Sequence, residues 1–373
     1  MADPEPSTSK RLPTQRWVGI VVLVIVVALT LQWRRALPVH APANATDAAE
    51  YLFSGDTMGT TYHIKVVAPE SQMDNQSDAV AAAIQERLDR VIALMSTYEP
   101  NSELSRFNAQ TDNTPFAVAP ETFNVFQIAQ QVSAETSGAF DVTVGPLVNA
   151  WGFGADGKRS EPTQEDIAAL LKRVGYQKLT LDPLTSTVQK QQADLYCDLS
   201  SVAEGYAVDL VAEKLDALHL ENYMVEIGGE VRTRGKNRAN QPWQIGIQKP
   251  DEQGLVAGAV VALSGQSLST SGDYRKFIES PDGRRRSHHI NPATGMPVDH
   301  VIASASVITD SCAFADAYST ALMILGPDKS MALAEKLNLA IYLIVQSPDK
   351  SVHVIMSPQF ERYLQPATPA VIQ

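Results

Sequence analysis

Residues 197–210 read CDLSSVAEGYAVDL, and this stretch predicts the change from strand to helix around which the fold is organised. A strand is expected over 195–198, and a helix is expected over 200–218 because its apolar residues recur at the spacing of one buried face. The start of a helix exposes backbone N–H groups that suit anionic or polar ligands. Asp198 can bind such a ligand, but it can equally cap the helix. Glu204 can likewise be a first-turn carboxylate favoured by the helix dipole.

The rest of the chain mixes helices and strands without a regular strand–helix–strand repeat. Apolar residues at helical spacing predict helices over 80–95, 121–135, 164–174, 313–325 and 329–337. Alternating or short apolar runs predict strands over 62–66, 179–181, 223–227, 243–247, 257–263, 303–309, 340–345 and 352–356. This pattern favours an α+β fold with mixed sheets and packed helices, in one large domain of two fused lobes.

The composition is that of a globular protein with a substantial core, since 44% of the 373 residues are hydrophobic and 19% are charged. The net charge of -12 argues against sequence-independent binding of nucleic acid, which needs an excess of Lys and Arg. It does not exclude a small polyanionic ligand whose charge is neutralised by a metal ion. Cys197 and Cys312 form neither a disulfide framework nor a zinc spacing, so we expect two buried free thiols.

The N-terminus carries a targeting signal. Basic residues at 10, 11 and 16 precede an apolar stretch, 17–31, which is followed by Gln-Trp-Arg-Arg at 32–35. The stretch is short for a spanning helix of about 17–25 residues, and it is long for a signal-peptide core of about 7–15 residues. Tryptophan at both ends is typical of a membrane interface. We expect an uncleaved anchor with the body of the protein outside, and a cleaved signal peptide is the alternative.

These observations divide the chain into five segments. We expect a cytoplasmic segment over 1–16, an anchor over 17–33, an Ala- and Pro-rich linker over 34–50, a globular domain over 51–360 and a tail over 361–373.

Two pairs of residues in the globular domain are candidates for ligand contacts. Asp316 and Thr320 lie four apart in a strongly apolar predicted helix, so they share one face and offer two oxygen ligands of the kind that Mg²⁺ prefers. A carboxylate in an apolar helix is costly unless it is paired or bound to a metal. Gly228 and Gly229 follow a predicted strand, and they permit either a close approach to a ligand or a hairpin turn.

A polar segment near residues 269–297 contains hydroxyl groups, Asp273 and the neighbouring His288 and His289. In an extended chain two neighbouring side chains point to opposite faces, so we expect at most one histidine to face a given site. A metal pair is conceivable, but no third ligand accompanies the histidines at a metalloenzyme spacing.

The order of these motifs resembles the ApbE family of FAD:protein FMN transferases, from residue 58 to about residue 345. The matching motifs, in family order, are MGTTY at 58–62, STY at 96–98, SELSRFN at 102–108, AFDVTVGPL at 139–147 followed by WGFG at 151–154, Asp198, Gly228-Gly229, TSGDY at 270–274, His289-Ile290 and the Asp316/Thr320 pair.

The resemblance implies roles for individual residues. The FAD site would be lined by Met58, Tyr98, Ala139, Phe140, Asp141, Asp198, Glu204, Gly228, Gly229 and His289. Mg²⁺ would be held by the side chains of Asp316 and Thr320 and the backbone carbonyl of Ser201. His289 and Asp273 are the candidates for a general base. Many family members carry Lys where this chain has Glu204, so neutralisation of a diphosphate by that lysine is not expected here.

The implied reaction moves FMN from FAD to a Ser or Thr of a partner flavoprotein through a phosphoester bond and releases AMP. The expected partners are subunits of Na⁺-translocating NADH:quinone reductase or Rnf-type complexes. The expected location is the bacterial inner membrane with the catalytic domain in the periplasm, and the lack of a lipobox cysteine favours a peptide anchor over a lipid. The alternatives are an Mg²⁺-dependent FAD pyrophosphatase and a non-catalytic flavin-binding assembly protein.

Overall fold

The computed structural model describes residues 48–154, 161–251, 254–273, 277–279, 285–299, 302–347 and 351–365. These described residues all belong to one compact unit. The predicted anchor over 17–33 and the segment before it lie outside the described residues, as does the end of the predicted tail. Within the described part of the chain, none of the helices combines the length and the apolar character that crossing a bilayer requires.

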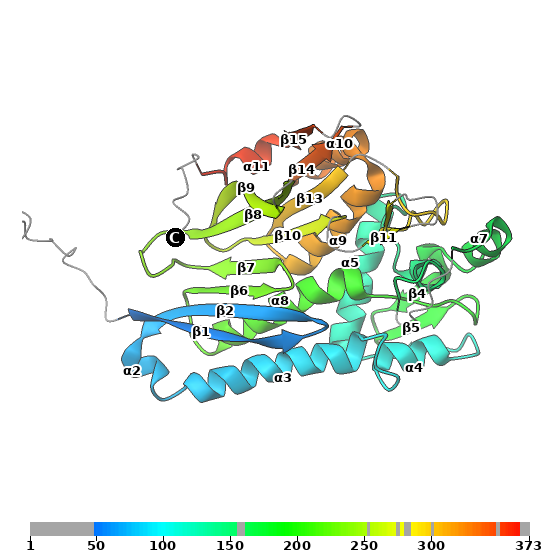
Figure 1. Cartoon of the computed structure of the whole chain (residues 1–373). Coiled ribbons are helices and arrows are strands. Elements are labelled where there is room, and N and C mark those ends of the chain that lie inside the picture. Colours follow the sequence, from blue (N-terminus) through cyan, green and yellow to red (C-terminus); the bar gives the residue numbers. More distant parts are fainter. Residues whose placement is uncertain are drawn as a thin grey trace, which may run out of the picture. The chain divides into compact units, whose positions relative to one another are not determined.

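An eight-stranded sheet forms the centre of this unit, with strand order β1-β2-β6-β7-β10-β13-β14-β15 (Figure 1). Its strands are β1 (Ala48–Thr57), β2 (Thr60–Pro69), β6 (Tyr223–Ile227), β7 (Glu230–Arg234), β10 (Ser267–Gly272), β13 (Ile302–Thr309), β14 (Ala340–Gln346) and β15 (Val352–Met356). The predicted α+β class is confirmed. The expectation of mixed sheets is wrong for the described residues, because neighbouring strands pair antiparallel throughout this sheet. Two-residue turns join β1 to β2 and β6 to β7, and such turns permit only antiparallel pairing.

Both faces of the sheet are covered, which explains why β14 is apolar at almost every position. Ile341, Leu343 and Val345 belong to the largest cluster of buried side chains, together with residues of the packed helices. Tyr342 and Ile344 belong to a second cluster on the opposite face. Because successive side chains of a strand point to opposite faces, a strand between two cores has no polar face.

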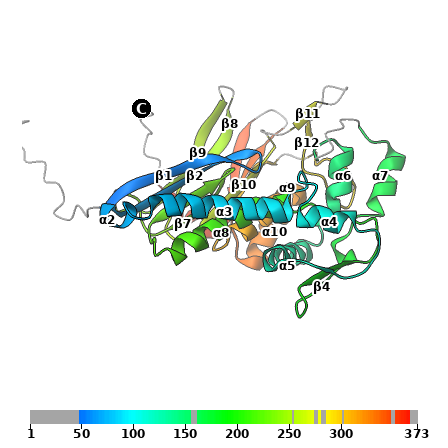
Figure 2. The ribbon, with the colours of Figure 1, turned by 90° about the horizontal axis from the view of Figure 1, so that it is seen from below.

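The helices that carry the site cover the first face. They are α8 (Ser200–Ala217) and α9 (Cys312–Leu325), supported by α3 (Ser77–Met95), α5 (Pro120–Glu135) and α10 (Pro327–Leu337). α8 packs against α9 and α3, and α9 contacts β10 and β13. The second face is covered by the hairpin of β8 (Trp243–Asp251) and β9 (Gly254–Leu263) and by α11 (Pro358–Glu361). Figure 2 shows α3 and α8 on the side of the sheet away from β8 and β9.

The remaining elements lie outside the central sheet: α2 packs against β2 at the end opposite α7, and the others lie toward the α7 end (Figure 1). They are the helices α2 (Glu70–Met73), α4 (Glu103–Ala109), α6 (Gly145–Ala150) and α7 (Gln164–Leu171), the 3₁₀ helices η1 (Val142–Val144) and η2 (Tyr176–Lys178), a sheet of β3 (Phe116–Ala117), β5 (Thr187–Lys190) and β4 (Leu179–Asp182), and the hairpin of β11 (Phe277–Glu279) and β12 (Arg285–Ser287). A third apolar cluster joins α6 and α7 to the turn after Ile290, and the indole of Trp151 donates to the carbonyl of Gly295 at 2.8 Å.

The strand predicted over 195–198 is not formed, because side chains rather than a neighbouring strand satisfy its backbone. The side-chain amide of Asn108 donates to the carbonyl of Cys197 at 2.8 Å and accepts from the N–H of Cys197 at 2.8 Å. The buried ammonium of Lys190 donates to four carbonyl oxygens, including that of Leu195 at 3.3 Å. This irregular segment leads directly into α8. Cys197 and Cys312 are free and buried, as predicted.

Candidate active site

Helices α8 and α9 approach closely at Gly205, and this contact positions Asp316. A Cβ on Gly205 would lie 2.5 Å from the carbonyl oxygen of Cys312, so only glycine allows the approach. The N–H of Gly205 donates to Oδ2 of Asp316 at 3.0 Å. In a regular helix that N–H would point to the carbonyl of Ser201, four residues earlier. The carboxylate of Asp316 therefore lies beside the turn of α8 that runs from Ser201 to Gly205. Asp316 and the carbonyl of Ser201 are two of the three predicted metal ligands.

Asp316 is buried, and burial raises the pKa of its carboxyl well above the usual value, with the nearby Glu204 carboxylate adding to the effect. Thr320 lies one turn further along α9, and its hydroxyl is 3.3 Å from that of Ser271 on β10. From successive turns of α9, Asp316 therefore contacts α8 and Thr320 contacts β10.

Glu230, the first residue of β7, is a site residue that the sequence analysis missed. Its side chain is buried, and Oε1 accepts from Ser269 at 3.4 Å, whereas Oε2 has no hydrogen-bond partner among the described residues. Burial raises the pKa of Glu230 well above its usual value, and the carboxylates of Asp316 and Glu204 raise it further. The only available signal was a carboxylate directly after the Gly228-Gly229 pair.

The Gly228-Gly229 pair forms the tight β6–β7 turn, with φ of 66° and 113°, and it also borders the acidic site. A Cβ on Gly228 would lie 2.6 Å from Oε2 of Glu204 and 3.3 Å from Oε2 of Glu230. The hairpin-turn reading of the glycine pair is confirmed, and the turn brings the backbone against two carboxylates. A ligand contact at this turn stays a prediction. Carboxylates from α8, β7 and α9 converge here, and a buried carboxylate oxygen without a partner is a group that a bound cation would satisfy.

Hydroxyl groups link this acidic site to β10. The hydroxyl of Ser319 on α9 lies 3.2 Å from that of Ser269 and 2.8 Å from that of Ser271. β10 ends at Gly272, and Asp273 follows immediately. The acidic site and the second predicted site, at Asp273 and His289, are therefore connected through one strand.

Asp273 and His289 form a hydrogen-bonded pair, with Nδ1 of the buried His289 2.7 Å from Oδ1 of Asp273. The hydroxyl of Ser287 donates to the same oxygen at 2.5 Å. Burial alone would raise the pKa of Asp273, but its hydrogen bond with His289 and the electrostatic effect of that imidazole lower the pKa below the usual value. This is the arrangement of a base whose ring is oriented by a carboxylate.

The expectation that His288 and His289 face opposite sides is wrong. β12 ends at Ser287 and the chain bends at His288, so the alternation of an extended strand does not apply. The centroids of the two imidazole rings are 4.0 Å apart, and the ring of Phe153 lies 6.2 Å from that of His288.

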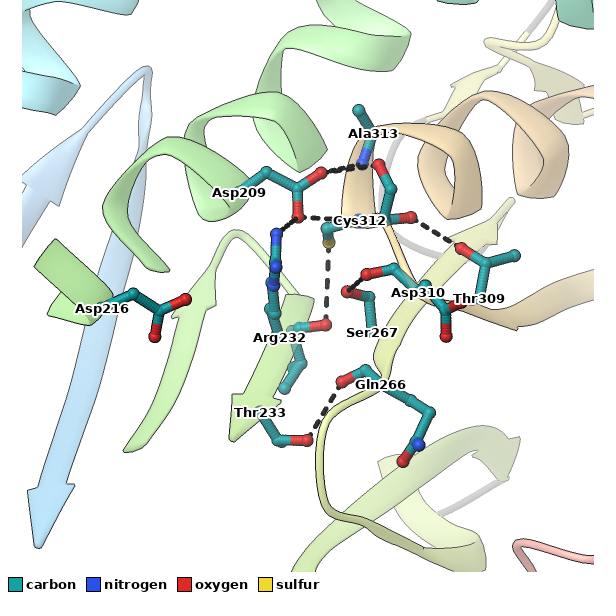
Figure 3. Close-up of polar contacts among 12 residues, drawn as sticks. Asp209, Asp216, Arg232, Thr233, Gln266, Ser267, Thr309, Asp310, Cys312 and Ala313 are labelled. Atoms are coloured by element: carbon teal, nitrogen blue, oxygen red, sulfur yellow. Dashed lines mark hydrogen bonds and ion pairs between the residues drawn. The ribbon is translucent and has the colours of Figure 1, made fainter. Parts of the chain in front are cut away.

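Asp209 on α8 holds the first turn of α9 and was not singled out from the sequence (Figure 3). Its carboxylate accepts from the N–H of Cys312 at 3.0 Å, the N–H of Ala313 at 3.0 Å and the hydroxyl of Ser311 at 2.7 Å. It also pairs with Arg232 on β7 at 2.7 Å. Asp209 therefore caps α9 from a neighbouring helix and ties β7, which carries Glu230, to α9, which carries Asp316.

Except for Glu204 on α8, the residues predicted to bind the flavin lie on turns and loops. Met58 and Gly59 form the β1–β2 turn, with φ of 48° and 74°, beside a hollow of about 480 Å³ lined by residues 56–61. The Tyr98 ring is 67% exposed, and its loop is held by bonds such as that from the N–H of Tyr98 to the hydroxyl of Ser96 at 3.1 Å. An exposed ring on a braced loop is available to stack against a ligand.

In the 139–141 segment the side chains support the loop. The ring of Phe140 is buried in the main core. The carboxylate of Asp141 accepts from Thr143 and from the N–H of Tyr176 at 2.8 Å, so both of its oxygens are engaged. A ligand contact here would come from the backbone or from Ala139. Oδ1 of Asp198 accepts from the N–H of Ser200, the first residue of α8, at 2.9 Å, although the N-cap position itself is Leu199.

Comparison with known proteins identifies close similarity over the described body. The sequence model of the ApbE family matches residues 58–343. The chain is 46% identical to the FAD:protein FMN transferase of Haemophilus influenzae over 79% of this chain and 86% of that protein. It is 41% identical to the Vibrio cholerae FAD:protein FMN transferase over 81% of this chain and 89% of that protein.

Solved structures show the same fold. The flavin transferase ApbE from Vibrio cholerae superposes with a TM-score of 0.78 at 41% identity, covering 85% of this chain and 100% of that chain. The apo form of the Pseudomonas stutzeri flavinyl transferase ApbE gives a TM-score of 0.78 at 35% identity, covering 86% of this chain and 98% of that chain.

Proposed function

Because the chain belongs to the ApbE family, we propose that it is a FAD:protein FMN transferase that attaches FMN from FAD to a Ser or Thr hydroxyl of a partner protein and releases AMP. The observation that carries the proposal is the connection between two different polar sites. A buried site of carboxylates and hydroxyls at Asp316, Thr320 and Glu230 is joined through β10 to the Asp273–His289 pair. Phosphoryl transfer needs both charge neutralisation and positioning of the attacking hydroxyl.

We further propose that the acidic site holds Mg²⁺, through Asp316, Thr320 and the carbonyl of Ser201. Support comes from the raised pKa values of Asp316 and Glu230 and from the unpartnered Oε2 of Glu230, since carboxylates crowded in this way are stabilised by a hard cation. When bound, the metal neutralises charge that develops on the diphosphate during transfer. Glu204 is a further carboxylate at this site, where many family members carry Lys. It therefore adds negative charge that a bound cation would neutralise.

His289 is proposed as the general base. Asp273 accepts from Nδ1, which leaves Nε2 as the atom that takes the proton of the attacking hydroxyl. The hydroxyl oxygen forms the new bond to the FMN phosphorus as the bond from that phosphorus to the AMP oxygen breaks. Asp273 stabilises the imidazolium that results, because its carboxylate remains ionised.

For the flavin we propose contacts from Met58, the Tyr98 ring, the Ala139–Asp141 backbone, Asp198 and the Gly228-Gly229 turn. Two of these contacts are supported by the positions of the residues: the Met58 turn borders a hollow, and Tyr98 is exposed. Glu204, beside Glu230 and Asp316, and His289, paired with Asp273, are proposed to contact the diphosphate.

We propose that the protein acts at the bacterial inner membrane with its catalytic domain in the periplasm, on subunits of Na⁺-translocating NADH:quinone reductase or Rnf-type complexes. The support is the basic–apolar–basic pattern over residues 10–35. Tethering the enzyme in the same membrane as its acceptor would raise the effective concentration of the acceptor.

The test incubates the full-length chain with FAD, Mg²⁺ and a purified acceptor subunit, and follows flavin fluorescence on the denatured acceptor together with free FMN and AMP. A fluorescent acceptor carrying covalent FMN at one Ser or Thr by mass spectrometry is expected. Free FMN with an unlabelled acceptor would instead establish the pyrophosphatase, and no turnover of FAD would establish a non-catalytic binding protein. The His289→Gln variant should label the acceptor about 10²–10⁴-fold more slowly.

A further inference from the structure

Asp273 lies close to the neighbouring residues His288 and His289, so three potential metal ligands come together beside the proposed base. Asp273, His288 and His289 each offer one ligand atom, and these atoms lie within 4.8 Å of one another. Asp273 follows the end of β10, whereas the two histidines lie at the bend after β12. The sequence spacing showed no third metal ligand beside the two histidines. The fold supplies one, Asp273, from the end of a different strand.

The donor set differs in kind from that of the acidic site. Two imidazoles and one carboxylate form the set that suits Zn²⁺ and related transition metals, whereas Mg²⁺ prefers oxygen ligands alone. With bonds of about 2.0–2.2 Å, tetrahedral Zn²⁺ ligand atoms lie roughly 3.3 Å apart. The observed separations are 2.7 Å for the Asp273–His289 pair and at most 4.8 Å for the group, so they lie on both sides of the tetrahedral value.

The surroundings permit entry of an ion and keep a coordination position open. His289 is buried, but Asp273 and His288 are only partly buried, so the group faces solvent on one side. Three protein ligands with one position left for water is the arrangement of an accessible zinc site rather than of a closed structural one.

We propose that Asp273, His288 and His289 form a transition-metal site, with Zn²⁺ as its preferred ion, and that Zn²⁺ bound there inhibits the enzyme. A zinc ion takes the place of the proton shared between Nδ1 of His289 and Asp273, and it reorients the imidazole that the transfer reaction uses. The inhibitory half of the inference rests on the proposed function, whereas the binding half does not.

The binding test uses full-length protein freed of metal and held in millimolar Mg²⁺, which occupies the oxygen site. Zn²⁺ is titrated in competition with a chromogenic chelator. One Zn²⁺ that Mg²⁺ does not displace is expected per chain. His288→Gln and Asp273→Asn should each weaken that affinity by at least about 10–100-fold, the range that even outer-shell changes produce. His63→Gln is the matched control, because His63 pairs with Glu226 on β2 and β6 instead. An affinity that His288→Gln leaves unchanged overturns the site.

The inhibition test measures acceptor labelling at saturating Mg²⁺ with increasing Zn²⁺. The His288→Gln variant should label the acceptor at the unmodified rate without Zn²⁺ and require at least about tenfold more Zn²⁺ for half inhibition, in line with the loss of a ligand. Inhibition that excess Mg²⁺ reverses would place the zinc at Asp316 and refute the proposal. Zinc that binds as predicted without slowing transfer would refute the inhibitory half. If the chain labels no acceptor at all, the proposed function fails while the binding test still decides the site.

Discussion

Replacing Asp209 by Asn tests whether one buried carboxylate holds helix α9, and with it the proposed metal ligands. Asp209 accepts four hydrogen bonds, from Arg232, Ser311 and the N–H groups of Cys312 and Ala313 (Figure 3). An Asn keeps the shape but loses the charge and presents an amide N–H₂ to at least one of these donors.

The magnitude follows from burial. The side chains of Asp209 and Arg232 are only 8% and 23% exposed, and breaking a buried ion pair by removing one partner costs about 3–5 kcal/mol. One backbone N–H of α9 also loses its acceptor, a change that costs about 1–3 kcal/mol and overlaps with the first. We therefore expect Asp209→Asn to lower the free energy of unfolding by about 3 kcal/mol in urea titrations.

The same helix offers a matched control. Asp216 pairs with Arg234 at 2.6 Å, but these side chains are 32% and 45% exposed. Asp216 also accepts from the hydroxyl of Tyr223 at 2.7 Å, a bond that the oxygen of an Asn can still accept. Asp216→Asn makes the identical chemical change at a solvated pair and should cost no more than about 1 kcal/mol. Because α9 carries Asp316 and Thr320, Asp209→Asn should also weaken apparent Mg²⁺ affinity in the labelling assay by about 10–100-fold, and Asp216→Asn should not. Equal losses of stability for the two variants, or unchanged Mg²⁺ affinity for Asp209→Asn, would refute the reasoning.

Asp316→Ala should abolish acceptor labelling while circular dichroism and the urea midpoint stay close to those of the unmodified protein, and undiminished labelling would contradict the metal assignment. The pKa of Glu230 is raised in the folded state, so the metal-free protein binds more protons when it is folded than when it is unfolded. The free energy of unfolding should therefore fall as the pH rises above about 4.5, the usual pKa of a glutamate. Glu230→Gln should flatten that slope in urea titrations at several pH values, and an unchanged slope would show that another group causes it. Gly205→Ala should destabilise by about 1–3 kcal/mol or more, because its Cβ would meet the carbonyl of Cys312 at 2.5 Å. Gly246→Ala, where no atom lies within 4 Å of the new Cβ, is its control, and similar losses for both would exclude the close contact as the cause.

Local patterns predicted most of the elements. The helical spacing over 313–325 and the glycine stop after it correspond to α9 (Cys312–Leu325), and the predicted 223–227 strand is β6 to the residue. Such predictions succeed because amphipathic periodicity and turn chemistry are properties of short windows of sequence. The strand over 195–198 failed because Asn108 and Lys190, both distant in the sequence, satisfy its backbone.

The candidate site was only partly predictable for the same reason. Asp316 and Thr320 stood out because a carboxylate in an apolar helix needs a partner, and their spacing gives them one face. Asp198 presented two roles that the sequence weighed equally, and the structure shows it accepting from the first N–H of α8, one residue before the N-cap Leu199. Nothing in the local sequence distinguished Asp209 from the other acids of α8, because its four partners come from β7 and from the start of α9.

The sequence by itself determined the α+β class, the free buried thiols and the motif order that shows the family. Only the tertiary structure decided which acids are buried together, that the two neighbouring histidines lie side by side, and that Glu230 belongs to the site. The physical reason is that the free energy of a charge depends on what surrounds it. Burial and neighbouring carboxylates that raise the pKa of Glu230 come from β7, α8 and α9, and these elements meet only when the chain folds.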